Sequence, residues 1–414
     1  MMTMLYIDPG TGSMLFTILI GILGTCVYLL RNVWVKLRFT LSGGAKEKQA
    51  EQDRIPFAVF SDSKRYWNQF EPICDEFERR EQPLIYMTAS PDDPALKKEY
   101  KYVKCSFIGE GNRAFAHLNF LKADILLSTT PGLDVYQWKR SRDVKWYVHI
   151  PHASNDIVLY RMFGLDYYDA VLLSGEYQIA QIRELEERRH LPAKEMLTVG
   201  MPYMDAVKAR LDAAPPLEAH ETTVLLAPSW GSSGILSRYG ADIIRALLAT
   251  GYHVVVRPHP QSFTAEKDLM DKLMKEFPNS DRLEWNRDND NFEVLRRSDI
   301  LISDFSGVIF DYALVFGRPV IYADTSFDKS PYDACWLDEE LWTFTTLPKI
   351  GKKLSPEMFP EMKSLIDGML NDPQYREAIE TAKAETWEHI GESAALTADY
   401  LIRKRESLCA EAEK

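Results

Sequence analysis

Residues 301–312 read LISDFSGVIFDY, and this stretch indicates the class of fold. The apolar run up to Ile302 predicts a buried strand, and the small residues Ser306 and Gly307 predict a turn that opens a helix. The free N–H groups at the start of a helix favour an anion, and small residues let the anion approach the main chain. The stretch therefore predicts a phosphate site at the end of a strand in an α/β sheet.

A second strand end with polar residues occurs about forty residues earlier, where residues 254–260 read VVVRPHP. The planar guanidinium of Arg257 matches phosphate oxygens, and His259 can donate to the same group or move a proton. A surface turn after a buried strand is the alternative. The proximity of two polar strand ends in one half of the chain favours a ligand site.

Four small or polar residues mark the turn of the first stretch and are candidates for binding a phosphorylated ligand: Ser303, Asp304, Ser306 and Gly307. Ser and Asp also cap helices, and capping uses the same backbone donors as phosphate binding, so the two roles are compatible.

Two further candidates for binding that ligand are Asp311 and Ser229. Asp311 lies in an otherwise apolar helix, where it either accepts the ribose hydroxyls of a nucleotide or pairs with an arginine. Ser229 belongs to APSWGSS, residues 227–233, a strand-end loop rich in small donors that is otherwise a simple turn.

In the first half of the chain, residues 147–156 read YVHIPHASND. His149 lies within the expected strand and fits a core histidine. His152 follows in the loop, where it would face a cleft and act as a general base. His149, Asn155 and Asp156 are possible acceptor-side residues, and Asn155 or Asp156 could instead cap the next helix. An H-x-x-H metal pair is disfavoured because no acid or cysteine lies at ligand spacing, so we expect no protein-bound metal, while a loosely held Mg²⁺ stays open.

Composition narrows the class of protein. The chain has 414 residues, which favours two domains. Its net charge of −12 argues against a nucleic-acid binder. The five cysteines form no CxxC pair, which favours a reduced, cytosolic bulk.

The N-terminus differs from the rest in composition. Residues 14–30 read MLFTILIGILGTCVYLL and are followed by Arg31, Lys36 and Arg38. About twenty apolar residues span a bilayer, and basic residues mark the cytoplasmic flank. We therefore expect a single-pass anchor in the cell membrane with the catalytic domains in the cytoplasm. A cleaved signal peptide would have its charges before the apolar run, and a buried first helix is the remaining alternative.

Strands and helices alternate through the rest of the chain, which predicts parallel sheets covered on both faces. We expect an α/β protein with two Rossmann-like domains facing each other across a cleft. The expected divisions are a membrane anchor (1–40), a linker (41–54), an acceptor domain (55–210), a proline-rich linker (211–221), a nucleotide-donor domain (222–390) and a C-terminal helix (391–414).

The expected strands are residues 57–60, 84–88, 102–108, 125–128, 146–150, 171–174, 223–227, 254–257, 300–303 and 319–322. The expected helices are residues 62–80, 112–122, 176–189, 243–249, 267–277 and 308–316, and residues 356–405 are expected to be helical throughout.

The order of the motifs PHAS, GMPYMD, APSW, RPHP and SDFSGVIFDYALVFGRPVIY, over residues 149–322, resembles the CDP-glycerol glycerophosphotransferase family of bacterial teichoic acid synthesis. The resemblance implies a GT-B-type fold and a membrane-associated enzyme. The implied reaction moves glycerol phosphate or ribitol phosphate from a CDP-alcohol to a hydroxyl of a lipid-linked acceptor and releases CMP.

The resemblance also implies roles for individual residues. His152 matches the histidine of the family's WHG segment, the base for the acceptor hydroxyl, and His259 matches the RPHP histidine that contacts the donor phosphates. The implied pyrophosphate and nucleotide loop comprises Ser303, Asp304, Ser306 and Gly307. Three departures leave the donor open: PHASN replaces WHGTP, Gly231 replaces an arginine, and Gly307 replaces a serine.

Two other classes of function remain. A nucleotide-sugar glycosyltransferase or UDP-sugar 2-epimerase-like enzyme is one, because the spacing from Asp304 to Asp311 resembles their donor-binding segment. A membrane-tethered scaffold without chemistry is the other. The sequence leaves open the acceptor, a priming or polymerising role, and the oligomeric state.

Overall fold

The computed structural model of the protein describes residues 54–412, except residues 289, 305–306 and 324–327. Ile55–Lys414 form one compact unit. The expected anchor and all but the last residue of the first expected linker lie outside the described residues. In the described part of the chain, no helix is long and apolar enough to cross a bilayer. The expected domain boundaries stay predictions.

The first half of this unit is built on a parallel sheet that has, within the described residues, seven strands in the order β3-β2-β1-β4-β5-β6-β7. The strands are β1 (Ile55–Ser61), β2 (Leu84–Thr88), β3 (Val103–Phe107), β4 (Ala123–Ser128), β5 (Val144–His149), β6 (Ala170–Leu173) and β7 (Glu195–Thr198). The strand order reverses between β1 and β4, and the crevice outside the carboxyl ends at such a point binds ligands in open α/β sheets.

The second half is built on a parallel sheet with six described strands in the order β10-β9-β8-β11-β12-β13. The strands are β8 (Thr223–Leu226), β9 (His253–Val256), β10 (Leu283–Trp285), β11 (Ile300–Ser303), β12 (Val320–Ala323) and β13 (Gly351–Leu354). Here the order reverses between β8 and β11. The two expected α/β sheets are therefore confirmed.

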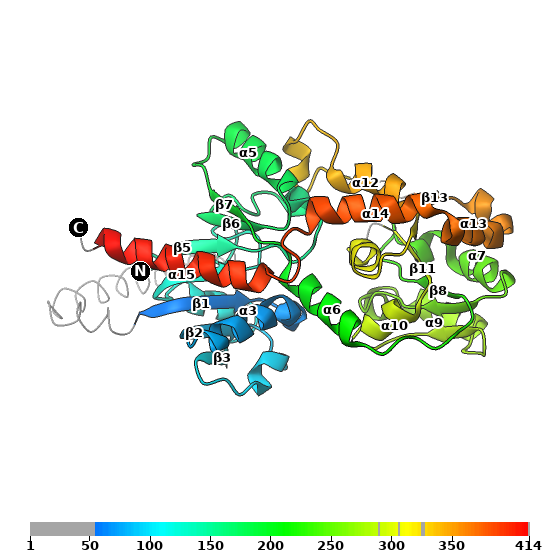
Figure 1. Cartoon of the computed structure of the whole chain (residues 1–414), viewed down its shortest axis with the longest axis horizontal. Helices are drawn as coiled ribbons and strands as arrows, with labels where there is room; N and C mark the ends of the chain where they lie inside the picture. Colours follow the sequence, from blue (N-terminus) through cyan, green and yellow to red (C-terminus); the bar gives the residue numbers. More distant parts are fainter. Residues whose placement is uncertain (1–53, 289, 305–306, 324–327, 413–414) are drawn as a thin grey trace, which may run out of the picture. The chain divides into compact units, whose positions relative to one another are not determined.

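Helices connect the strands (Figure 1). Those of the first half are η1 (Lys64–Tyr66), α3 (Trp67–Arg79), η2 (Pro94–Lys97), α4 (Asn112–Leu118), η3 (Ile157–Leu159), α5 (Tyr177–Arg189) and α6 (Pro202–Ala213). Those of the second half are α7 (Ile235–Ala249), α8 (Ser262–Ala265), α9 (Lys267–Glu276), α10 (Phe292–Arg297), α11 (Val308–Phe310), the π-helix η4 (Asp311–Val315), η5 (Asp333–Trp336), α12 (Trp342–Ile350), η6 (Pro356–Glu361) and α13 (Met362–Asn371).

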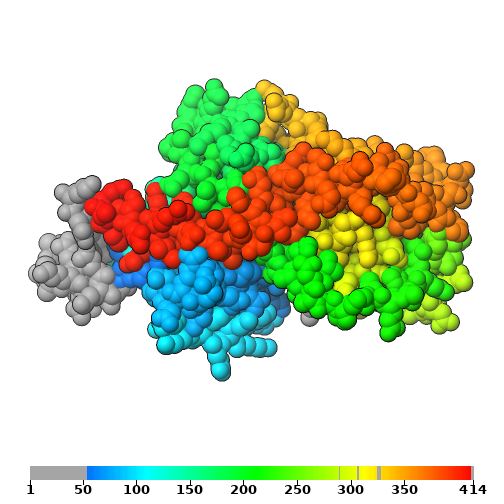
Figure 2. Space-filling view, in the orientation of Figure 1, coloured from blue at the N-terminus to red at the C-terminus, as the bar shows by residue number. Residues whose placement is uncertain are grey.

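The last two helices return the chain to the first sheet. α14 (Pro373–Thr386) contacts α12 and η4, whereas α15 (Ser393–Ala412) contacts α3 and β4. Figure 2 shows these helices, in orange and red, as one continuous band over the surface. At the crossing, a Cβ on Gly200 would lie 2.1 Å from the carbonyl oxygen of Glu388, and its φ is +87°. Only glycine fits this close approach.

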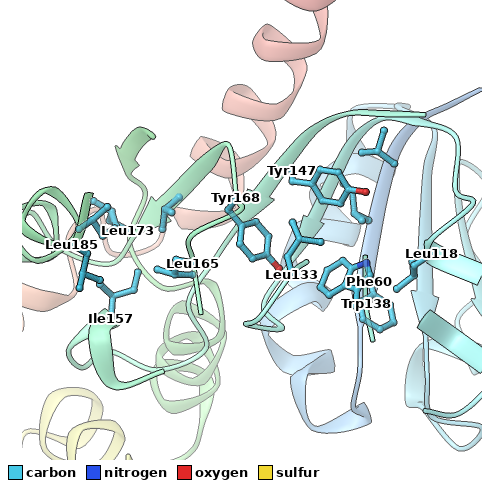
Figure 3. Packing of buried hydrophobic residues seen from close by; sticks show 14 of the residues in the cluster. Phe60, Leu118, Leu133, Trp138, Tyr147, Ile157, Leu165, Tyr168, Leu173 and Leu185 are labelled. Atoms are coloured by element: carbon cyan, nitrogen blue, oxygen red, sulfur yellow. The ribbon is translucent and has the colours of Figure 1, made fainter. Parts of the chain in front are cut away.

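Apolar side chains fill both faces of the sheets. All six residues of β4 are buried, as expected for a parallel strand covered by elements on both sides. On one face of the first sheet, the rings of Phe60 and Trp138 meet edge to face with centroids 5.2 Å apart, in the same cluster as Tyr147 and Tyr168 (Figure 3). Phe60 is near the carboxyl end of β1, so this packing fixes the position of that strand end in the sheet.

Several expected elements were wrong in extent. The expected helix 62–80 begins as η1 and becomes α-helical at Trp67. The expected helix 308–316 is one α-helical turn followed by a π-helix, and residues 356–405 are broken into four helices. β10, β13, α6, α10 and α12 were not among the expected strands and helices. β13 reads GKKL with two exposed lysines, so it has no apolar run to reveal it.

Candidate functional site

A cleft of about 540 Å³ is lined by residues that follow strands of both sheets. Five residues singled out in the sequence line it: His152, Asn155, His259, Gly307 and Asp311. The other lining residues are Arg65, Tyr66, Asn68, Gln69, Ala153, Tyr203, Val207, Asn291, Leu295, Val308, Val315 and Phe316. Folding therefore brings the two candidate histidines to one cavity.

His152 lies in the loop after β5, with one ring nitrogen held by the protein. Its Nδ1 lies 3.0 Å from the hydroxyl oxygen of Thr129, which is fully buried. Nε2 has no hydrogen-bond partner among the residues that the structure describes. Burial lowers the pKa of His152 to about 4, so the ring is neutral at pH 7. With the proton on Nδ1 facing Thr129, Nε2 is the nitrogen that can accept a proton from the cleft.

Two tyrosine rings orient the His152 ring. The centroid of Tyr66 lies 4.6 Å from it and that of Tyr160 lies 5.7 Å from it. The Tyr160 hydroxyl lies 3.1 Å from Nε2 of His149. His149 itself is fully buried in β5, and burial holds its pKa well below the ordinary range. His149 thus occupies the core position that its strand predicted and does not line the cleft.

His259 reaches the cleft from the loop after β9. Its Nδ1 accepts a hydrogen bond of 3.1 Å from the backbone N–H of Gln261, which leaves Nε2 for a ligand. Burial and the nearby positive charge of Arg65 lower its pKa, while Asp304 opposes the change. Arg65 comes from η1 in the first half, so the cleft has a cation on the side facing His259.

Arg257 lies elsewhere than expected from the RPHP motif. It does not line the cleft. Its Nη1 donates to the side-chain oxygen of Asn286, and its Nη2 donates to the carbonyl oxygen of Asp288 at 2.7 Å. Burial lowers its pKa. The guanidinium therefore braces the segment after β10, and the expected contact with a phosphate remains an untested prediction.

Ser303, Asp304 and Ser229 form a brace between the ends of β8 and β11. The Ser303 hydroxyl donates to the carbonyl oxygen of Ala227 at 2.6 Å. The Asp304 carboxylate accepts the backbone N–H of Ser229 at 2.9 Å and also the Ser229 hydroxyl. Burial raises the pKa of Asp304, and these hydrogen bonds oppose the rise. The brace holds the turn before α11 in place.

The turn itself presents backbone to the cleft. Gly307 lines the cavity, and a Cβ added to it would meet nothing within 4 Å. Space is therefore open beside its main chain, which suits a bulky anion. Ser306, the neighbouring candidate, lies outside the described residues.

Asp311 opens the π-helix η4 and meets a tyrosine. The Tyr203 hydroxyl, from α6, donates to its carboxylate. Of the two alternatives for Asp311, pairing with an arginine is thus not observed among the residues that the structure describes. Burial raises the pKa of Asp311 to about 6, and the hydrogen bond from Tyr203 opposes the rise. Both side chains line the cleft. A π-helix at this position agrees with a functional site, because π-helical turns occur frequently at such sites.

Asp156 has a structural role that the sequence did not indicate. Its carboxylate accepts the backbone N–H groups of Trp342 and Thr343, at 2.9 and 2.8 Å, and so caps α12 instead of the next helix in the chain. Asn155 lines the cleft, and its carbonyl oxygen accepts a hydrogen bond of 2.8 Å from the side chain of Gln178.

The described residues contain no group of three or more His, Cys, Asp or Glu that could hold a metal ion. The expectations about metal and Mg²⁺ stay predictions.

Contributors to the site that sequence reasoning missed include Arg65, Gln69 and Tyr203. The buried amide of Gln69 donates to the carbonyl oxygen of Pro151 at 2.9 Å and accepts from the backbone N–H of Tyr203 at 3.3 Å. It thereby links α3, the His152 loop and α6. A polar residue on the otherwise apolar face of a helix was the only signal in the sequence.

Two parallel α/β sheets with a cleft at the ends of their strands define the chain as a GT-B-type protein. Residues 165–335 match the model of the family described as CDP-Glycerol:Poly(glycerophosphate) glycerophosphotransferase. This match supports the family resemblance found in the sequence, and the family that it names is one of transferase enzymes, which implies a CDP-alcohol donor and an acceptor. The matched segment contains His259, Gly307 and Asp311 but begins after His152. No curated protein sequence matches the chain.

Solved structures resemble the fold at low sequence identity. The Methanocaldococcus jannaschii UDP-GlcNAc 2-epimerase in complex with UDP-GlcNAc and UDP has a TM-score of 0.55 and 11% identity, over 84% of this chain and 99% of that chain. The Neisseria meningitidis UDP-GlcNAc 2-epimerase bound to UDP-GlcNAc has a TM-score of 0.53 and 13% identity, over 84% and 99%. The Staphylococcus aureus MnaA–UDP structure has a TM-score of 0.55 and 11% identity, over 82% and 94%. At these identities the likeness supports the fold alone.

Proposed function

We propose that the chain transfers glycerol phosphate, or a similar polyol phosphate, from a CDP-alcohol to a hydroxyl of a lipid-linked acceptor and releases CMP. The product would be a teichoic acid or another cell-surface polymer. The observation that carries this proposal is the meeting of His152 and His259 at one cleft, in a chain that matches the glycerophosphotransferase family over residues 165–335.

In the proposed reaction, Nε2 of His152 takes the proton of the acceptor hydroxyl. The hydroxyl oxygen forms a bond to the β-phosphorus, which carries the alcohol, and the bond from that phosphorus to the bridging oxygen breaks. CMP leaves with the bridging oxygen and its electron pair. The neutral ring of His152 and its contact with Thr129 support the role of a base.

The donor diphosphate would lie against His259, Arg65 and the backbone at Gly307. Positioning and neutralisation of developing charge supply most of the catalysis in displacement at phosphorus. Arg65 lowers the pKa of His259, which supports the view that the two side chains lie close enough to contact the same diphosphate. Asp311 and Tyr203 would contact the ribose of the nucleotide, because a carboxylate is a strong acceptor for hydroxyl groups.

We further propose that residues 1–40 anchor the chain in the cell membrane as a single pass, with the catalytic domains in the cytoplasm. The support is the apolar run of residues 14–30 and the basic residues after it. An anchor would raise the local concentration of a membrane-embedded acceptor. We propose no tightly bound cofactor, and titration of the reaction with EDTA tests whether Mg²⁺ accompanies the diphosphate.

The test is release of labelled CMP from CDP-glycerol and CDP-ribitol with membranes as the acceptor. We expect turnover with one of them, and a large loss in His152→Ala and His259→Ala. The matched control is His117→Ala, which changes an exposed histidine outside the cleft. Absence of turnover with both donors, or full turnover in both cleft variants, would contradict the proposal.

A nucleotide-sugar enzyme is the second candidate, favoured by the spacing from Asp304 to Asp311. Ligand protection against thermal unfolding separates the two. A nucleotide present at one hundred times its Kd stabilises the fold by about 2.7 kcal/mol. CDP or CMP should protect in the first case, and UDP in the second.

A further inference from the structure

The amino end of the first sheet, opposite the cleft, carries exposed aromatic and basic side chains. In the turn between α4 and β4, Phe120 is 81% exposed, and in the turn before β6, Tyr167 is 46% exposed. Exposed apolar side chains that gather at one end of a sheet mark an interaction surface. We call Phe120, Lys122, Lys139, Arg142 and Tyr167 the edge patch.

Hydrogen bonds hold the three turns of the edge patch together. The Ser141 hydroxyl donates to the carbonyl oxygen of Leu121 at 2.7 Å, and the backbone N–H of Lys139 donates to the side-chain oxygen of Asn119, also at 2.7 Å. The guanidinium of Arg140 bonds the carbonyl oxygen of Tyr167 and pairs with Asp169. These bonds hold the three turns in fixed positions relative to one another.

The edge patch is locally basic on an acidic chain. Lys122, Lys139 and Arg142 are exposed, against two acids, Asp134 and Asp143, in the loop between β4 and β5, whereas the whole chain carries a net charge of −12. Lys122 and Arg142 form no ion pair within the described part of the chain. Basic side chains beside exposed aromatic rings are suited to a membrane surface. The cations would meet anionic headgroups, and the rings would lie at the boundary with the apolar layer.

The chain enters the fold at the edge patch. The backbone N–H of Ile55, the first residue of β1, donates to the carbonyl oxygen of Lys122 at 3.0 Å. The sequence before Ile55 contains the apolar run of residues 14–30. α15 ends at the same edge, where Arg405 bonds Asp124 near the start of β4 (Figure 1).

We propose that the edge patch docks on an anionic membrane surface, with Phe120 and Tyr167 at the level of the headgroups and the basic side chains on lipid phosphates. The inference rests on the proposed membrane placement and names the surface that would face the bilayer. The cleft lies at the other end of the strands, about 20 Å away for a strand of six residues. A lipid-linked acceptor has to reach across that distance, and changes at the patch leave the cleft intact.

The test places a polarity-sensitive fluorophore on the full chain at Phe120→Cys or, as matched control, at Phe107→Cys. Phe107 is 44% exposed and is the last residue of β3, so it lies at the carboxyl ends of the strands, away from the edge patch at their amino ends. Both chains also carry Cys335→Ser, because Cys335 is an exposed native cysteine, and the labelled Cys335→Ser chain sets the background. The vesicles contain phosphatidylglycerol in phosphatidylcholine, or phosphatidylcholine alone, each with and without a nitroxide-labelled lipid.

We expect a blue shift and nitroxide quenching at position 120 on phosphatidylglycerol vesicles, with neither at position 107. Each cation near an anionic surface strengthens attraction by about fivefold. Lys122→Glu with Arg142→Glu should therefore abolish the signal at position 120.

Equal signals at positions 120 and 107, equal signals on both kinds of vesicle, or no signal at 120 would overturn the proposal. A blue shift without vesicles that grows with protein concentration would assign the patch to a second copy of the chain and also overturn it. CMP release separates the two ideas. Turnover that persists while position 120 gives no signal refutes the docking surface alone, whereas absence of turnover in every chain refutes the proposed function.

Discussion

We expect Asp311→Asn to stabilise the fold at neutral pH and to weaken donor binding. Asp311 is a carboxylate in a buried setting whose one described hydrogen-bond donor is Tyr203. Burial raises its pKa from 3.8 to about 6. The folded state therefore binds the proton more tightly than the unfolded state, and stability falls as the pH rises from 4 to 6.

The magnitude follows from this pKa. At pH 8, above both pKa values, the change from 3.8 to about 6 corresponds to about 3 kcal/mol of lost stability, and at pH 4 the loss is only about 0.5 kcal/mol. An asparagine has nearly the same shape and no charge, so the variant should recover most of this free energy at pH 8 and little at pH 4. Loss of a charged acceptor for a ribose hydroxyl costs about 1.5–3 kcal/mol, so the KM for the donor should rise about 13- to 160-fold.

The assay is urea unfolding of the parent and variant chains from pH 4 to pH 8, beside donor KM at pH 8. The matched control is Tyr203→Phe, which removes the hydrogen bond and keeps the charge, and which should destabilise the fold at pH 8. The reasoning is refuted if Asp311→Asn is less stable than the parent at pH 8, or if the donor KM is unchanged.

The remaining predictions concern the base and the cations of the cleft. Because burial lowers the pKa of His152 to about 4, kcat should not fall through protonation of this group between pH 7.5 and pH 5.5, and a tenfold fall that is absent from His152→Ala would contradict this. Thr129→Val should lower kcat by about 2- to 13-fold, the contribution of one hydrogen bond, with donor KM unchanged. A fall in thermal stability with no fall in kcat would indicate that Thr129 has a structural role only. Arg65→Ala should raise donor KM about tenfold or more, as expected for a charged hydrogen bond, whereas the neighbouring exposed Lys64→Ala should not. Arg257→Ala should lower thermal stability more than it raises KM, since its guanidinium bonds Asn286 and Asp288; the opposite pattern would restore the expected phosphate contact.

The sequence by itself determined the layered α/β architecture and the edge at which the site forms. Periodicity and apolar runs are local properties, so strands such as Leu84–Thr88 could be placed to the residue. Polar residues just after buried strands could be assigned to the carboxyl ends of the sheets, and this places His152 and His259 at a cleft without knowledge of their distance. The family motifs could be read for the same reason, since each is a continuous stretch.

Only the tertiary structure decided which side chains face the cleft and which brace its walls. Arg257 and Arg65 are both arginines just after a strand, yet Arg257 is held by Asn286 and the chain at Asp288, while Arg65 reaches toward His259. Asp311 meets Tyr203 from α6, a partner more than one hundred positions away. A short sequence pattern records neither the direction of a side chain nor a distant hydrogen-bond partner, because both depend on how helices and loops pack over the sheet.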